Sequence, residues 1–123
     1  MKKIGAIVFG LLMITAGAVH FALPATYEPF LSPILPPSVV TAIIYISGLV
    51  EILIGIAMFV PSLKSKGSLA ILVLMVCFLP LHIADVFREN PAIGNHTAAY
   101  IRLPIQVLLI YLAFLLWKSH KND

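Results

Sequence analysis

The chain has 123 residues, of which 61% are hydrophobic and 11% charged, with a formal net charge of +3 at pH 7. Soluble domains are about 45–50% apolar and about 25% charged, so this composition indicates an integral membrane protein that forms one domain over residues 1–123. The basic residues are spread over chain ends and loops without forming a patch, which argues against a nucleic-acid partner. The single cysteine, Cys77, excludes an intramolecular disulfide and a CxxC thiol relay within this chain.

The first predicted span covers residues 4–21. Two lysines precede it and small residues close it, as in a secretory signal peptide, but the apolar run exceeds the usual length of about 7–15 residues. We therefore expect a retained span. Small residues at helical spacing lead up to His20 near its end, and such residues let helices approach closely in lipid. His20 is thus predicted to point into a helix bundle.

The next segment, residues 23–37, contains five prolines and cannot form one continuous helix. Apolar and aromatic residues lie between the prolines, which favours a segment in the membrane interface. Two interpretations remain open: a lid over the mouth of the bundle, or a connector that only links two spans.

The second predicted span, residues 38–60, contains one carboxylate, Glu51, in an otherwise apolar run. A charge at that depth costs roughly 2.5–3.5 kcal/mol on insertion scales. Ser47, Gly48 and Gly55 share a helical face with Glu51 and leave room for a partner helix or a ligand. A compensating group inside the protein is therefore expected.

The third and fourth predicted spans cover residues 68–87 and 98–117. His82 and Asp85 share a face near the end of the third span, and Arg102 and Gln106 share a face at the start of the fourth. Prolines inside both spans are expected to kink the helix or free a backbone carbonyl.

The lysines predict the topology. They gather at the two chain ends and in the loop between the second and third spans, whereas the other two connectors carry only Arg88. The expected fold is therefore an all-α, four-span transmembrane helical bundle with both termini cytoplasmic and a proline-rich interfacial segment between spans one and two.

Six polar groups in these spans are predicted to lie at the membrane midplane or on its outer side: His20, Glu51, His82, Asp85, Arg102 and Gln106. Facing lipid, they would together cost on the order of 10 kcal/mol, so they are expected to converge inside the bundle. Arg102 has two candidate partners, Glu51 and Asp85. His96 and His120 are interpreted as solvated residues of a loop and the tail.

Three roles for this cluster remain open. It can be an ion-pair network that only fixes helix register. It can line a pocket for a quinone-like head group, with Arg102 and Gln106 as hydrogen-bond donors, Glu51 as charge partner or proton acceptor, and His20 as a proton-carrying donor. It can also hold a metal through His20, His82 and a carboxylate, although no same-helix spacing supports this third role, and we predict no metal site.

Four stretches of this sequence, in this order, resemble the DoxX-like family of small four-helix membrane proteins. They are His20-Phe21 with Pro24, Tyr45 to Ile52, Pro80-x-His82, and Ile101 to Gln106. The resemblance covers nearly the whole chain, and the SGLVE and IRLPIQ stretches are its most specific parts.

The resemblance implies a protein of the bacterial cytoplasmic (inner) membrane. Founding relatives are subunits of a thiosulfate:quinone oxidoreductase, others look like accessories of membrane thiol redox or enzyme maturation, and eukaryotic cousins act as cargo receptors or receptor chaperones. We therefore expect an accessory of an oxidoreductase that binds a quinone or similar hydrophobic small molecule, with a protein partner or a second copy of the chain. The alternative is a non-enzymatic chaperone or scaffold.

Overall fold

The computed structural model describes residues 2–122, and in this range every regular element is helical and no strand is present. The elements are α1 (Lys2–Ala22), η1 (Pro24–Thr26), α2 (Glu28–Leu31), α3 (Pro37–Ala57), η2 (Pro61–Leu63), α4 (Lys64–Val86) and α5 (His96–His120). The segments Lys3–Ala22, Pro37–Ala57, Pro61–Val86 and His96–His120 are long and apolar enough to cross a membrane. The predicted all-α fold with four membrane-spanning helices is therefore confirmed.

The helix ends differ from the predicted spans by a few residues. α3 ends at Ala57 instead of continuing to Val60, because a turn follows it and the residue before Pro61 is biased away from helical backbone. α4 begins earlier than predicted, at Lys64, and α5 continues to His120.

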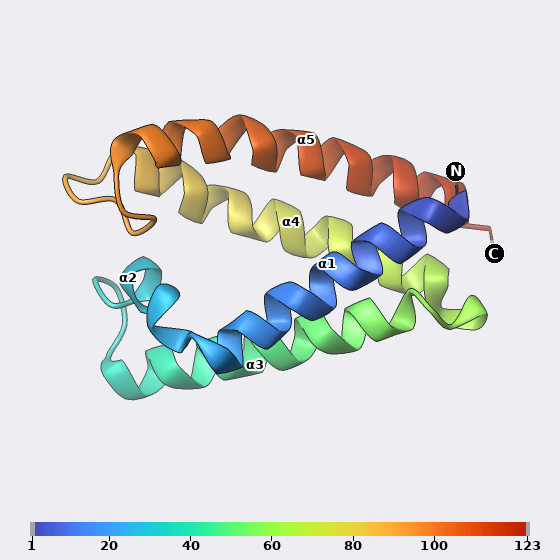
Figure 1. Ribbon diagram of the computed structural model, residues 1–123, viewed down its shortest axis with the longest axis horizontal. Helices are drawn as coiled ribbons and strands as arrows, with labels where there is room; N and C mark the ends of the chain where they lie inside the picture. Colours follow the sequence, from blue (N-terminus) through green and yellow to red (C-terminus); the bar gives the residue numbers. More distant parts are fainter. Residues whose placement is uncertain (1, 123) are drawn as a thin grey trace.

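The four long helices form two antiparallel pairs, α1 with α3 and α4 with α5, and the two chain ends lie at the same end of the bundle (Figure 1). Contacts within each pair are far more extensive than contacts between the pairs. The molecule is therefore two helical hairpins joined along part of their length.

Glycines set the spacing of the α1–α3 pair. A Cβ atom on Gly17 would lie 2.5 Å from Gly48 O, and one on Gly55 would lie 2.7 Å from Gly10 O. The two helices therefore meet backbone to backbone at two levels, as small residues allow in lipid. This close approach brings side chains of α1 into hydrogen-bond range of α3.

The two hairpins are held together by an apolar core. Its buried residues come from α1, α4, α5 and the turn after α3, and the partly buried Ile54 of α3 packs against them: Ala6, Phe9, Met13, Met58, Ile71, Met75, Ala113 and Leu116. Most of these residues lie in the half of the bundle that carries the chain ends (Figure 1). The predicted polar site residues lie mainly in the other half, toward the end of the bundle opposite the termini.

The proline-rich segment folds into two short helices, η1 and α2, which contact α1 and α3 at the end of the bundle opposite the termini (Figure 1). Pro24 opens η1, Pro29 is the second residue of α2, and Pro37 opens α3, where the missing N–H and fixed φ of proline suit a helix start. We call residues 24–31 the cap segment.

Candidate functional site

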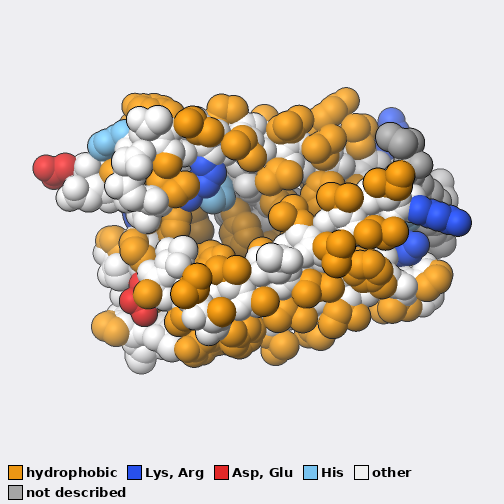
Figure 2. Space-filling view, viewed as in Figure 1, with side chains coloured by type: hydrophobic (Ala, Val, Ile, Leu, Met, Phe, Trp, Pro, Cys, Tyr) orange, Lys and Arg blue, Asp and Glu red, His pale blue; other side chains and the backbone are white. Residues whose placement is uncertain are grey.

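A cavity of about 500 Å³ lies between the two hairpins and against the cap segment. In the space-filling view, the surface is hollowed between α1 and the α4–α5 pair, and basic side chains lie at the edge of this hollow (Figure 2). Five of the six predicted site residues line the cavity: His20, Glu51, His82, Arg102 and Gln106. The sixth, Asp85, is fully buried outside this lining.

His20 and Glu51 form a buried pair across the α1–α3 contact. His20 Nε2 lies 2.8 Å from Glu51 Oε2, and the opposite ring nitrogen, Nδ1, lies 2.9 Å from the backbone oxygen of Ile44. Because a carbonyl oxygen only accepts hydrogen bonds, this geometry assigns a proton to Nδ1. The 2.8 Å separation of Nε2 and Oε2 leaves room for one further proton between them, although Oε2 has no hydrogen bond of regular geometry among residues 2–122.

That shared proton makes the pair neutral overall. It is either a neutral imidazole beside a protonated carboxyl group or an imidazolium beside a carboxylate, and both have zero net charge. A pair with zero net charge avoids most of the free-energy cost of placing a lone charge in the membrane. The His20–Glu51 pair therefore compensates the carboxylate that the sequence placed in an apolar run, and it can give or take one proton at the cavity wall.

Arg102 pairs with Asp85, not with Glu51. Arg102 Nη2 donates to Asp85 Oδ2 at 3.0 Å, and Arg88 Nη1 lies 3.8 Å from Asp85 Oδ1. The same carboxylate accepts hydrogen bonds from the backbone N–H groups of Ala92 and Ile93 in the α4–α5 loop. Asp85 therefore fixes the loop and the orientation of Arg102, and it is committed to partners within the chain.

Two polar atoms at this wall, Arg102 Nε and His82 Nδ1, are buried without a hydrogen-bond partner among residues 2–122, and a third such atom, Glu51 Oε2, lies at the other side of the cavity beside His20. Arg102 and His82 both line the cavity. Leaving a buried donor unsatisfied costs about 1–3 kcal/mol, and more for a charged group. These atoms are therefore the groups in the lining that a bound molecule would satisfy most directly.

Gln106 uses its amide nitrogen within the protein. Nε2 donates to the backbone oxygen of Met75 at 2.8 Å, in the helix turn that precedes Pro80. The expectation of a polar group facing the interior holds, but this donor already serves α4. The second N–H of this amide has only a long contact with Met75 Sδ at 3.8 Å, so it is the donor that the predicted role toward a ligand would use.

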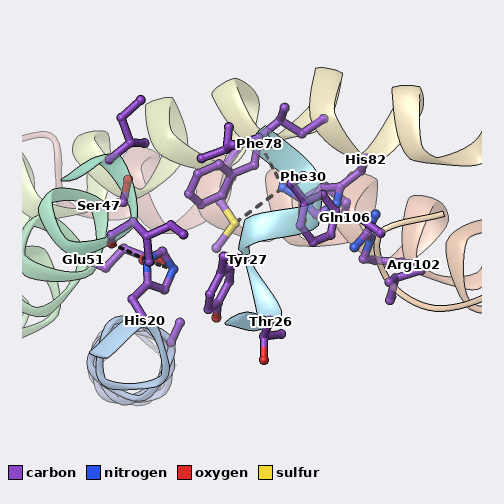
Figure 3. Close-up of a pocket in the computed structure, with 18 of the residues that line it drawn as sticks. His20, Thr26, Tyr27, Phe30, Ser47, Glu51, Phe78, His82, Arg102 and Gln106 are labelled. Carbon is purple, nitrogen blue, oxygen red and sulfur yellow. Dashed lines mark hydrogen bonds and ion pairs between the residues drawn. The ribbon is translucent and has the colours of Figure 1, made fainter. Parts of the chain in front are cut away.

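The cap segment supplies two aromatic residues that sequence reasoning did not single out. The ring of Tyr27 lies 3.9 Å from the ring of His20, centroid to centroid, and the guanidinium of Arg102 lies 4.9 Å from the centroid of Phe30. Figure 3 shows the His20–Glu51 pair and the His82–Arg102 group on different sides of the cavity, with Tyr27 between them. The cap is therefore a wall of the cavity and not only a connector.

Burial and the charge of Glu51 raise the pKa of the Tyr27 phenol above its usual value. The phenol therefore keeps its proton across the physiological range, and Tyr27 is available as a neutral donor beside His20. The only sequence signal for this role was an aromatic residue between prolines, which also fits a simple interfacial anchor.

A family model described as Domain of unknown function (DUF8561) matches residues 9–117. This match covers most of the chain and all the helices that line the cavity. The chain belongs to the DUF8561 family. No match was found among curated proteins or among solved structures.

The two remaining histidines of this DUF8561 chain lie outside the cavity. His96 is exposed, as predicted, and Nε2 lies 2.7 Å from Arg88 O. His120 is only 1% exposed and its Nδ1 lies 3.0 Å from Leu116 O, so the expectation of a solvated tail residue was wrong. α5 extends further than predicted, which places this ring on a packed helix instead of in a free tail.

Within residues 2–122, no three His, Cys, Asp or Glu side chains gather closely enough to hold a metal ion. His20 is engaged with Glu51, and His82 lies beside Phe30 with ring centroids 6.4 Å apart. The arrangement in this DUF8561 chain therefore offers paired hydrogen-bonding groups around a largely apolar cavity.

Proposed function

We propose that this protein binds a lipid-soluble small molecule with a quinone-like head group in the cavity between its two hairpins. The observation that carries the proposal is the pair of unsatisfied buried atoms, Arg102 Nε and His82 Nδ1, in the lining of a cavity of about 500 Å³. Ligand sites are typically apolar clefts of about 300–1,000 Å³ with a few polar groups that fix orientation.

The head group would lie between two chemically different walls. Arg102 and His82 would donate hydrogen bonds to one carbonyl oxygen, and the neutral His20–Glu51 pair, with Tyr27 beside it, would supply or accept a proton at the other side. The hydrophobic tail would leave through the hollow between α1 and α5, toward the lipid (Figure 2).

We further propose that the protein is an accessory of an oxidoreductase in the bacterial cytoplasmic membrane, with its electron donor supplied by a protein partner. The resemblance of its helix motifs to the DoxX-like family supports this proposal. Five described lysines, Lys3, Lys64, Lys66, Lys118 and Lys121, belong to the end of the bundle with the termini, and this asymmetry favours that end in the cytoplasm. The cavity would then face the outer half of the membrane.

Equilibrium binding tests the proposal. Purified protein in an uncharged detergent is titrated with short-chain ubiquinone and menaquinone analogues, and saturable binding with a raised unfolding temperature is expected. The double variant Asp85→Asn/Arg102→Gln removes the Arg102 guanidinium together with its carboxylate partner, and Arg88 keeps its hydrogen bonds to the Pro29 and Phe30 carbonyls. This variant should therefore fold and bind more weakly. Lys118→Gln, at the opposite end of the bundle, is the control and should bind normally. An absence of saturable binding by the unmodified protein would contradict the proposal.

The alternative, a scaffold or chaperone, is favoured by one observation: Asp85, outside the cavity lining, joins Arg102 to the backbone of the α4–α5 loop. Under this alternative, the polar groups serve only the fold. The double variant should then retain partner binding in a pull-down of the membrane complex, while no quinone analogue changes the unfolding temperature.

A further inference from the structure

The charges around the cavity do not balance. The His20–Glu51 pair is neutral because it shares one proton, and Tyr27 is a neutral phenol. The carboxylate of Asp85 faces two guanidinium groups, Arg102 at 3.0 Å and Arg88 at 3.8 Å. The single negative charge of Asp85 therefore lies opposite the two positive charges of Arg88 and Arg102. One positive charge of this group has no buried carboxylate to balance it.

The remaining charged groups at this end do not remove the excess. Glu28 and Glu89 are exposed side chains, and neither forms an ion pair within the described residues. His96 is exposed as well and contacts only the Arg88 backbone oxygen with its Nε2 atom. Water screens such surface charges, whereas charges beside a membrane-embedded cavity are screened much less.

The unsatisfied donors belong to the wall where this charged group reaches the cavity, since Arg102 lines the cavity and Arg88 does not. Arg102 donates through Nη2 to Asp85 Oδ2, and its buried Nε has no hydrogen-bond partner among residues 2–122. Phe30 covers one face of the guanidinium. His82 Nδ1, also unpartnered, belongs to the same wall and donates in the tautomer that protonates Nδ1. A neutral carbonyl oxygen would satisfy a donor but would leave the charge unbalanced.

We propose that the cavity selects lipid-soluble ligands with a single negative charge on the head group. An anionic oxygen at Arg102 and His82 would form charge-assisted hydrogen bonds, which are roughly twice as strong as neutral ones, and would neutralise the excess charge. The shared chemistry is one anionic oxygen on a hydrophobic body, either the enolate of an acidic hydroxyquinone or the carboxylate of a fatty acid. This inference rests on the cavity of the proposed function and goes further by specifying the charge of its ligand.

Matched ligand pairs test the inference on the unmodified protein. The first pair is a 2-hydroxy-3-alkyl-1,4-naphthoquinone, which is ionised at neutral pH, and its 2-methoxy ether, which is neutral. The second pair is a fatty acid and the fatty alcohol of equal chain length. Binding is measured in an uncharged detergent, and the anion of at least one pair is expected to bind about tenfold more tightly than its neutral partner or better.

The two pairs identify the source of the anion. Selectivity within the quinone pair alone supports an acidic quinone, selectivity within the fatty acid pair alone supports a lipid carboxylate, and both support general recognition of an anionic oxygen. Equal affinities within both pairs would overturn the inference. The single variant Arg102→Gln leaves Asp85 facing Arg88 alone and so removes the excess charge. It should lose the selectivity, and Lys118→Gln should keep it.

Failure of this inference and failure of the proposed function give different results. If neutral quinone analogues bind and the ionised ones bind no better, the proposed function stands and charge selection is refuted. If only the anionic ligands bind, charge selection stands and the neutral quinone is refuted as the ligand.

Discussion

At the scale of single residues, the buried acid in α3 is compensated by a histidine on a neighbouring helix, since His20 Nε2 lies 2.8 Å from Glu51 Oε2. The His20 ring is fixed from both sides, by Ile44 O at Nδ1 and by Glu51 at Nε2. The pair therefore acts as one unit with zero net charge. The two residues should therefore respond differently to substitution, because only Glu51 can be replaced by an uncharged residue that still donates to the other partner.

Glu51→Gln should be mild and His20→Leu severe. A glutamine amide can donate to a neutral His20 Nε2, so we expect a loss of less than about 1 kcal/mol in the free energy of unfolding, whereas His20→Leu strands a buried carboxyl group and should cost about 1–3 kcal/mol. Reversible unfolding in mixed micelles measures both. His20→Leu/Glu51→Leu, with no polar atom left, should recover part of the loss. Equal losses from the two single changes would show that the pair is held by charge alone.

At the scale of helices and segments, two devices shape the cavity: the glycine contacts that bring α1 against α3, and the cap segment that closes one end. Arg88 ties the cap to the α4–α5 hairpin, since its Nη1 donates to Pro29 O at 2.7 Å and its Nη2 to Phe30 O at 3.0 Å. The cap contacts α3 as well. The cap therefore bridges the two hairpins over the cavity.

Gly48→Ala should weaken the α1–α3 contact. The added Cβ would lie 2.6 Å from His20 Cβ and 2.9 Å from Gly17 O, so the helices must separate, at a cost of about 1–3 kcal/mol. The same change at Gly5 meets only a flexible Leu116 methyl group at 3.2 Å and serves as the control. Unfolding free energies of the two variants provide the comparison, and an equally small effect at both positions would refute backbone contact between α1 and α3.

Arg88→Gln should loosen the cap without unfolding the bundle. Losing the charged donor to the Pro29 and Phe30 carbonyls leaves the cap with fewer ties to α4, so amide hydrogen exchange in residues 27–32 is expected to accelerate. Exchange in the middle of α3 should stay unchanged. Lys66→Gln, an exposed change on the opposite side of the bundle, is the control. Unaltered exchange in the cap would show that Arg88 does not hold it.

Sequence reasoning predicted five polar residues of the cavity lining for one reason. A polar side chain in a long apolar run must face the interior, and this argument needs no knowledge of neighbours. It could not choose the partner of Arg102, because that depends on which helices are adjacent and how each is rotated. Glu51 and Asp85 were therefore left as alternatives, and the structure shows Asp85.

Loop conformation was equally beyond sequence reasoning. Asp85 binds backbone N–H groups of the α4–α5 loop, and Tyr27 and Phe30 belong to an aperiodic, proline-rich stretch with no helical pattern to orient them. Their roles depend on tertiary contacts alone. The burial of His120 was missed for a related reason, since the end of α5 carries polar residues that resemble a free tail.

At the scale of the whole molecule, the bundle is asymmetric from end to end. The apolar core joins the hairpins mainly in the half that carries the termini, and the cavity separates them in the other half. Lysines belong to the first end, while the acidic side chains visible in Figure 2 lie at the second. Because the two ends differ in charge, the asymmetry predicts which side of the membrane the cavity faces.

The lysine distribution predicts that the cap faces the outside of the cell. In a background with Cys77→Ser, a cysteine introduced by Ser32→Cys should react in intact cells with a membrane-impermeant maleimide. A cysteine introduced by Ser62→Cys, in the exposed η2 turn, should react only after the cells are opened. The reverse pattern would place the cavity in the cytoplasmic half of the membrane.

The most direct test of the central claim is nitrogen NMR of the protein labelled with ¹⁵N at histidine and arginine side chains, recorded in micelles with and without a saturating naphthoquinone analogue. The chain contains four histidines, so His96 and His120 outside the cavity serve as internal controls, and Arg88 serves the same purpose for Arg102. We predict that His82 Nδ1 and Arg102 Nε shift on ligand addition, while the control nitrogens stay in place. Unchanged signals from both His82 and Arg102 under saturating ligand would contradict the account.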